Sequence, residues 1–479
     1  MPFNTLKYSL FLPVVYLVFC LAGERARWCV LLGASLVFYA ALDVPYLLAI
    51  LMLVAVASYL FGIWLDKAQD PAAKRYLLWC GVATNLLILV AMKYLPFLSG
   101  NLQAVSSLLS LDTHIEPVKA FVAIGVSYYV FQAISYLFDI YLEIERPERH
   151  LGYFALYLAF FPKLLQGPIE RAGDLLPQLK AKYQLNHDNL RMGALLFLWG
   201  LFKKVVIADR LGVYVDAVYR DVHLYKGLPL LLATYAYGFQ IYLDFSGYTD
   251  MALGSALLFN IKLTQNFNSP YLATSVADFW RRWHISFSRW ILDYIFKPLQ
   301  MQWRNWKNWG TAAALITAFL ASGIWHGAGW GFVVWGGLHG LYMACSVFYK
   351  PHQKKLHKFL GIEKTRRLKV WQIFVTFHLV NLAWVFFRAN SITDALYVLS
   401  EIFSDMQIDF SNLYKALLPF SGDFTSIIHL LNLAIFFSIY YVVRKKDVVQ
   451  LSVSYIVIIS LLILLLGKFN TTSFMYMGY

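Results

Sequence analysis

The chain has 479 residues, of which 59% are hydrophobic and only 14% are charged. A soluble globular protein carries charge on about a quarter of its residues, so this composition excludes an ordinary soluble domain. Lys and Arg exceed the acids and give a formal net charge of +14. They cluster between apolar runs, which predicts contact with membrane lipid headgroups and no nucleic-acid binding.

Apolar runs near the roughly 20 residues that cross a bilayer recur along almost the whole chain. They are continuous and do not alternate with period two, so we predict an all-α fold, a polytopic transmembrane helical bundle of about 11 spans. The first run has the length of a signal-peptide core, but many spans follow it, and we interpret it as a retained helix. The clearest predicted spans are 6–22, 28–42, 46–65, 76–98, 120–142, 311–325, 331–349, 370–388, 427–443 and 450–467.

Charge in the loops predicts the orientation of these spans. Glu24–Arg27 and Asp66–Arg75 are basic or mixed, and Lys350–Lys369 holds eight Lys or Arg against the single acid Glu363. Residues 99–117 and 390–424 are polar but poor in Lys and Arg. The positive-inside rule places the first group in the cytoplasm. We therefore expect the N-terminus, and by an alternating count also the C-terminus, on the outer side.

Residues 150–310 do not follow this regular pattern. Apolar stretches are short and interrupted by Pro, Gly and charge at 160–171, 201–206, 244–254 and 278–290. Irregular or charged chain at membrane depth is tolerated only where protein or water surrounds it. We interpret these stretches as re-entrant or interfacial segments that line a cavity, within one transmembrane domain over 1–479. N-terminal spans occupy 1–150 of this domain and C-terminal spans 311–479, and the function is expected in the centre.

The stretch DFWRRWHISFSRW, residues 278–290, has aromatic residues at helical spacing with basic residues between them. One interpretation is an amphipathic helix on the cytoplasmic interface, with arginines reaching phosphates and tryptophans at headgroup level. The other is a basic, aromatic-walled pocket for an anionic ligand, because guanidinium groups suit phosphates and tryptophan faces suit a stacked ring. The basic members are Arg281, Arg282, His284 and Arg289, and the aromatic members are Phe279, Trp280, Trp283, Phe287 and Trp290.

The stretch SGIWHGAGW, residues 322–330, places His326 at the end of a predicted span. It either bonds neighbouring backbone, as many buried histidines do, or acts as a general base. Burial disfavours the charged imidazole, and a neutral ring can take a proton from an attacking hydroxyl. Gly323, Gly327 and Gly329 permit close approach of backbone and substrate.

Other polar residues give weaker signals. Asp139 and Asp244 lie on apolar faces, where each either orients an imidazole or an arginine or forms a structural pair between helices. On a helix shared with His326, His339 would lie on the opposite side. The four cysteines lack metal-type spacing and are interpreted as small core residues. No motif supports metal or nucleotide hydrolysis.

Several of these segments resemble one family, the membrane-bound O-acyltransferases, and within it the bacterial polysaccharide branch typified by alginate O-acetyltransferase. The resemblance runs from about residue 5 to about residue 470. Its longest and most specific part is NFNSPYLATSVADFWRRWHISFSRW, whereas a lone WHG would be weak. The matching segments are 121–141, 160–171, 244–254, 266–290, the WHG triplet Trp325–Gly327, and 381–389.

The resemblance implies a helical bundle around a central funnel or tunnel, through which an acyl group made available in the cytoplasm leaves on the other side. The family's near-invariant histidine matches His326, and its second signature histidine matches His284. Both are therefore expected to be catalytic, with a structural or donor-binding role open for His284. The supporting residues within the matching motifs are Asp244, Asp278, Trp325 and Gly327.

The resemblance also implies the substrates. The donor is a cytoplasmic thioester such as acetyl-CoA, with no bound cofactor and no metal. The acceptor is a polysaccharide hydroxyl outside an inner membrane, reached through a secreted or periplasmic acetyltransferase- or esterase-like partner. The candidates for holding the donor are Arg281, Arg282, Trp283, Lys203 and Lys204.

The chain departs from this pattern at one place. Many relatives read WLRDYLYIPLGG where residues 290–306 read WILDYIFKPLQMQWRNW, so Leu292 replaces a common arginine. The resemblance therefore does not specify the identity of the acceptor polymer. Lys297, Arg304 or Lys307 could supply the positive charge of the missing arginine. D-alanyl transfer to teichoic acid and O-acetylation of peptidoglycan are alternative reactions. A transporter and a scaffold for polysaccharide export are alternatives of another class.

Overall fold

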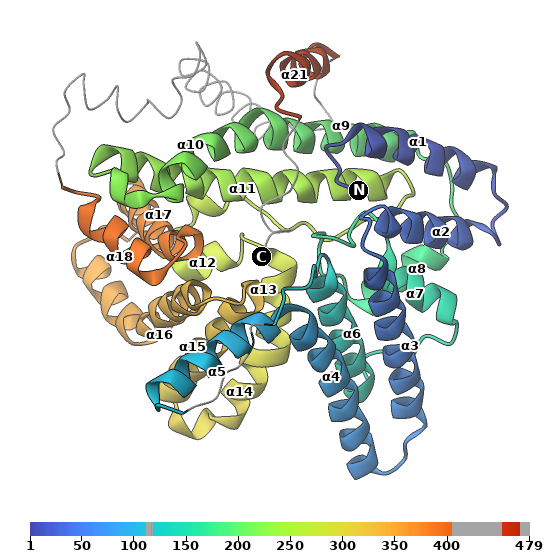
Figure 1. Cartoon of the computed structure of the whole chain (residues 1–479), viewed down its shortest axis with the longest axis horizontal. Coiled ribbons are helices and arrows are strands. Elements are labelled where there is room, and N and C mark those ends of the chain that lie inside the picture. The colour runs from blue at the N-terminus through green and yellow to red at the C-terminus, as the bar shows by residue number, and fades with distance from the viewer. Residues whose placement is uncertain (112–115, 117, 364, 405–452, 470–479) are drawn as a thin grey trace. The chain divides into compact units, whose positions relative to one another are not determined.

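The structure is a computed structural model that describes residues 1–111, 116, 118–363, 365–404 and 453–469. All regular elements in these ranges are helices (Figure 1). Among the described residues, four helices are long and apolar enough to cross a bilayer: α3 (Pro45–Lys67), α4 (Pro71–Lys93), α16 (Trp330–Phe359) and α17 (Arg366–Arg388). The expected total of about 11 spans stays a prediction, and the expected span at 427–443 lies outside the described residues.

The chain divides into two compact units, the first from Met1–Phe197 with Met251–Thr264 and the second from Leu198–Asp250 with Gln265–Met475. The single domain with divisions near 150 and 310 stays a prediction. Besides α3 and α4, the helices of the first unit are α1 (Leu6–Leu21), α2 (Arg27–Ala40), α5 (Leu95–Leu108), α6 (Val126–Tyr141), α7 (Leu151–Ala159), α8 (Ala172–Lys180) and most of α9 (His187–Phe202).

The second unit holds α16, α17 and most of the 30-residue helix α11 (Leu228–Leu257). It also holds several short helices, two of which, η1 and η4, are π-helical. Besides α11, α16 and α17, the elements of the second unit are η1 (Lys203–Ala208), α10 (Asp209–Arg220), η2 (Val222–Leu224), η3 (Pro270–Leu272), α12 (Val276–Trp280), α13 (Ile285–Ile291), η4 (Leu292–Phe296), α14 (Lys297–Gln302), η5 (Arg304–Trp306), α15 (Asn308–His326), α18 (Ile392–Glu401) and α21 (Val453–Leu466).

In the first unit, α6 packs closely against α3 and α4, and nearly every one of its residues is buried. Glycines permit this approach. A Cβ at Gly62 would lie 2.8 Å from the Tyr136 ring, and one at Gly81 would lie 2.8 Å from a methyl of Leu137. Small residues at such contacts let helices pack closely without a hydrophobic driving force in lipid.

The irregular centre predicted at 160–171 is confirmed as non-helical backbone. These residues form turns, and nearly all are buried. The Lys163 ammonium donates to the Gln132 side chain, and Glu170 accepts from the backbone N–H of Thr264 at 2.6 Å. Protein groups thus satisfy the charges that this segment buries.

The expectation that 244–254 is a broken segment is wrong, because α11 runs through it without interruption. The acidic side chains of this stretch pair with lysines of the neighbouring element η1, so the helical backbone is not interrupted. Asp244 binds Lys204 at 2.5 Å and Asp250 binds Lys203 at 2.7 Å. A Cβ at Gly247 would lie 2.8 Å from the Gly200 carbonyl oxygen, so the glycine serves close helix packing.

The interpretation of 278–290 as one amphipathic helix is also wrong. The chain forms α12, breaks at residues 281–284 and resumes as α13. His284 caps α13 with a left-handed backbone, φ 43°. Positive φ is costly for a residue with a Cβ and must be held by its surroundings. Asn266 holds it here, its carbonyl accepting from Ile285 N–H and its side chain from Ser286 N–H, both at 3.0 Å.

α15 and α16 form an antiparallel hairpin whose turn follows His326 (Figure 1). Their backbones nearly touch, since a Cβ at Gly336 would lie 2.4 Å from the Phe319 carbonyl oxygen and one at Gly323 would lie 2.3 Å from that of Phe332. His339 therefore does not share a helix with His326. Trp280 donates its indole N–H to the His339 Nδ1 at 3.2 Å.

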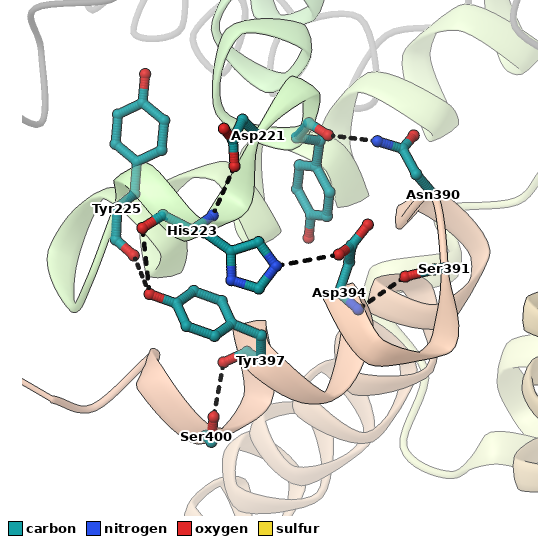
Figure 2. Close-up of polar contacts among 9 residues, drawn as sticks. Asp221, His223, Tyr225, Asn390, Ser391, Asp394, Tyr397 and Ser400 are labelled. Carbon is teal, nitrogen blue, oxygen red and sulfur yellow. Dashed lines mark hydrogen bonds and ion pairs between the residues drawn. The ribbon is translucent and has the colours of Figure 1, made fainter.

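A small polar cluster joins η2 to α18. Figure 2 shows the His223 ring facing Asp394, with Nε2 and Oδ1 3.3 Å apart. The Tyr397 hydroxyl donates to the Tyr225 carbonyl at 3.3 Å, and Ser391 caps α18 by accepting from the Asp394 N–H at 3.0 Å. This cluster ties α18 to η2.

Candidate functional site

A cavity of about 1000 Å³ lies within the second unit, between α15, α16 and the segment 277–296. This volume suits a ligand of cofactor size. Most of the wall is apolar, but four exposed cations line it: Arg281, Arg289, Lys350 and Lys354. Within the described ranges none of the four forms a salt bridge. Their charge is available to an anionic ligand.

The helical register of the α15–α16 hairpin shows which residues lie at the two ends of the cavity. On α15 the lining residues are Leu315, Ala318, Phe319 and Ser322, spaced three or four apart along one face. The next position on that face is His326, one turn beyond Ser322. On α16 the lining continues the other way and ends at Lys350, Pro351 and Lys354. The apolar passage therefore runs from a basic end to within one helical turn of His326.

His326 is enclosed by aromatic rings from three elements. It is 3% exposed, and its ring centroid lies 4.8 Å from Trp335 of α16, 5.4 Å from Phe387 of α17 and 5.4 Å from Phe287 of α13. Phe287 also lines the cavity. Phe287 therefore contacts the imidazole and also forms part of the cavity wall.

His284 contacts the same phenylalanine. Its ring centroid lies 5.0 Å from Phe287 and 4.8 Å from Phe245, and the residue is fully buried. Burial lowers the pKa of His284, because a low-dielectric surrounding disfavours the imidazolium. The structure therefore brings both predicted histidines to one aromatic cluster, with His284 as an uncharged ring at neutral pH.

Residues 142–388, just over half of the chain, match the family model described as MBOAT, membrane-bound O-acyltransferase family. The matched range includes both histidines, the cavity and α11. The chain belongs to the membrane-bound O-acyltransferase family. The predicted family and O-acyltransferase activity are confirmed, and the four span-length helices agree with a membrane location.

Curated relatives of this membrane-bound O-acyltransferase carry names from three reactions. A peptidoglycan O-acetyltransferase of Helicobacter pylori is 36% identical over 431 residues, 83% of this chain and 79% of the relative. A probable alginate O-acetylase of Pseudomonas putida is 34% identical over 430 residues, 89% of this chain and 85% of the relative. A teichoic acid D-alanyltransferase of Bacillus subtilis is 28% identical over 400 residues, 78% of this chain and 97% of the relative.

The predicted donor-binding residues of the O-acyltransferase separate in the structure. Arg281 lines the cavity, whereas its neighbour Arg282 is held by Asp278, with Nε and Oδ1 2.8 Å apart. Burial opposes ionisation of Asp278, but the bonds from Arg282 and from the Thr274 N–H at 3.0 Å keep its pKa below the usual value. Trp283 is fully buried, stacked 5.5 Å from Phe279, and does not line the cavity.

The two predicted lysines lie in a buried ion-pair cluster. Lys204 contacts Asp244 at 2.5 Å and Asp209 at 2.8 Å, while Lys203 contacts Asp250 at 2.7 Å. Neither lysine lines the cavity. Of the two alternatives for Asp244, the structure has the pairing between elements. We call this five-residue group the buried charge cluster.

Trp325 and Gly327, predicted to support the site, flank His326. The Trp325 ring stacks on Phe287 at 4.4 Å, and a Cβ at Gly327 would lie 2.1 Å from the Phe332 ring. Glycine is therefore the residue that lets the turn after His326 pack against α16. Leu292, the departure from the family pattern, is a lining residue of the cavity.

Sequence reasoning missed several lining residues. Lys350 and Lys354 were used only to orient the spans, and Ser322 was quoted without a role. A signal for Ser322 existed, because it precedes His326 by four residues and so shares its helical face. Arg289 was named only as one of the interleaved basic residues of 278–290, although it lies among the cations of the cavity.

Proposed function

We propose that this O-acyltransferase passes an acetyl group from cytoplasmic acetyl-CoA across a bacterial inner membrane for O-acetylation of an alginate-like exopolysaccharide. In this proposal the N-terminus is outside, about 11 spans surround a central tunnel, and a secreted or periplasmic partner delivers the group to the polymer. The observation that carries it is the cavity with a basic end at Lys350 and Lys354 and an apolar passage that reaches within one helical turn of His326.

The donor fits this cavity by charge and by length. Phosphates of CoA would meet Arg281, Arg289, Lys350 and Lys354, where guanidinium groups can bind two oxygens at once and ammonium groups act as point charges. The thioester arm would occupy the apolar passage along α15. The buried charge cluster takes no part in donor binding here, because its carboxylates already neutralise Lys203 and Lys204.

The chemistry proposed for His326 is general-base catalysis. The acceptor hydroxyl oxygen attacks the thioester carbonyl carbon, and its proton passes to the imidazole. The C–S bond then breaks, the sulfur leaves as thiolate and takes that proton, and the imidazole is neutral again. Such proton transfer typically contributes about 100- to 10,000-fold in rate. We assign His284, neutral and packed on Phe287, the role of supporting this ring, which lines the cavity and contacts the base.

The acceptor rests on the relatives. The name alginate O-acetylase belongs to relatives that cover up to 91% of this chain, and it supports an exopolysaccharide hydroxyl. O-acetylation of peptidoglycan is the second candidate, supported by the relative at 36% identity. D-alanyl transfer has the weaker support of a relative at 28% identity.

The test uses the purified chain in lipid vesicles with acetyl-CoA labelled in the acetyl group. The wild type should convert label to hydroxylamine-labile ester on an added alginate or peptidoglycan acceptor with its partner protein. His326→Ala should lower the rate by about 100-fold or more at equal amounts of folded protein. Label that crosses the membrane without forming an ester would overturn the proposal, as would a fully active His326→Ala variant.

A further inference from the structure

Ser322 is an unusual serine within this fold. It lies inside α15, is 1% exposed, and its hydroxyl has no hydrogen-bond partner among the residues that the structure describes. Buried serines in helices normally donate to the carbonyl four residues back. Ser35 does so to Leu31 at 2.7 Å and Ser255 to Met251 at 2.8 Å. Ser322 has the same local option and does not use it.

The hydroxyl lies where a substrate would need a donor. Ser322 is the lining residue of α15 closest along the helix to His326, and residues four apart on a helix have side chains about 5–6 Å from each other. Phe287 completes the arrangement, since it lines the cavity and contacts the His326 ring at 5.4 Å. His326 is not itself a lining residue, so a carbonyl group at the inner end of the cavity would lie beside the serine hydroxyl, within one helical turn of the imidazole.

We propose that the Ser322 hydroxyl donates a hydrogen bond to the carbonyl oxygen of the bound thioester and to the oxyanion that this oxygen becomes. The inference rests on the proposed function. During attack by the acceptor, electrons move from the C=O bond onto this oxygen, and they return when the C–S bond breaks. Ser322 keeps its proton throughout and forms no covalent bond. A buried donor without a protein acceptor gains most from a developing negative charge.

The alternative within the same geometry is a nucleophilic serine. In that case Ser322 would lose its proton to His326, take the acetyl group from sulfur and carry it as an ester until the acceptor arrives. The two roles differ in one observable. A nucleophile leaves acetylated enzyme when the acceptor is withheld, whereas a donor leaves none.

The experiment compares Ser322→Ala, Ser322→Thr and Ser35→Ala in vesicles with labelled acetyl-CoA. Ser322→Ala should lower kcat by about 100-fold with little change in the KM for acetyl-CoA, since the bond strengthens in the transition state. Ser322→Thr, which keeps a hydroxyl, should recover at least part of that loss. Ser35→Ala removes a bonded buried serine in the first unit and should lower thermal stability while kcat per folded enzyme stays unchanged.

Three results would overturn the inference. The first is a kcat for Ser322→Ala within about twofold of wild type while His326→Ala is inactive, which leaves the proposed function standing. The second is an activity loss that follows the loss of folded protein in Ser322→Ala. The third is a mass increase of one acetyl group on Ser322 in wild type incubated without acceptor. Failure of the proposed function itself is distinct, because then the wild type forms no ester.

Discussion

Two groups of basic residues in the second unit differ in burial and in whether carboxylates balance their charge. In the buried charge cluster, Lys203 and Lys204 are 6% and 1% exposed and bind carboxylates at 2.5–2.8 Å. At the cavity, Lys350 and Lys354 are exposed and have no salt bridge within the described ranges. Paired buried lysines hold elements together, whereas cations without carboxylates beside an apolar passage are suited to an incoming anion.

The largest expected effect is on stability, and it should distinguish the buried charge cluster from the lysines at the cavity. Lys204→Met leaves Asp209 and Asp244 buried beside each other without their cation, and the free energy of unfolding should fall by about 3–5 kcal/mol. The shift of the unfolding midpoint in SDS measures it. Adding Asp244→Asn should restore part of the loss, because one buried charge is removed.

The matched control is Lys350→Met at the cavity, which should change the free energy of unfolding by no more than about 0.5 kcal/mol. Equal destabilisation by Lys204→Met and Lys350→Met would erase the distinction between the two groups.

The next effect tests the cavity itself. Ala318→Trp places an indole in the passage between its basic end and His326, so the donor arm should be displaced. We expect kcat/KM for acetyl-CoA to fall by about 100-fold, as misplacement of a reacting group commonly does. Ile324→Trp adds the same group to the exposed side of α15 and should leave kcat/KM unchanged. An active Ala318→Trp enzyme would place the donor elsewhere.

A smaller effect is expected at the basic end. Exposed charge interactions are worth about 0.2–1 kcal/mol each, so Lys350→Gln with Lys354→Gln should raise the KM for acetyl-CoA by about two- to thirtyfold with kcat unchanged. Salt at about 0.5 M should shrink the difference from wild type. Lys297→Gln, at an exposed lysine bound to Asp293 outside the cavity, should leave KM unaltered. A salt-independent KM would argue against phosphate binding here.

The smallest effect is expected at the exposed cluster of Figure 2. The His223–Asp394 pair should contribute about 0.2–1 kcal/mol, because its partners are partly solvated. A double-mutant cycle with His223→Gln and Asp394→Asn, read by thermal unfolding, measures the coupling. A coupling of several kcal/mol would show that exposed and buried pairs do not differ in the way proposed here.

Much of the fold was predictable because hydrophobic runs report helices directly. The predicted spans 46–65 and 331–349 fall within α3 and α16, and the irregular turn at 160–171 was expected from its Pro, Gly and charge. The continuity of α11 was not, because Asp244 and Asp250 resemble helix interruptions until their lysine partners are known. Pairing between distant segments is a tertiary property that no local pattern contains.

The sequence also pointed to part of the candidate site, whose catalytic roles stay a prediction. The WHG motif pointed to His326, and the long block at 266–290 pointed to His284, which the structure joins through Phe287. Which cations face the cavity was not predictable, since Arg281 and Arg282 are adjacent in sequence and differ only in the direction of their side chains. A role for Ser322 can be inferred only from the structure, because it depends on the cavity that this residue lines.

The central claim is that the cavity holds the thioester with its acyl carbon next to His326. The most direct measurement is an experimental structure of the wild-type chain in lipid nanodiscs with a non-hydrolysable acetyl-CoA analogue. We predict phosphates at Arg281, Arg289, Lys350 and Lys354, and the acyl carbonyl between Ser322 and His326. An analogue bound at Lys203 and Lys204, or one whose acyl carbonyl lies away from His326, would contradict the account.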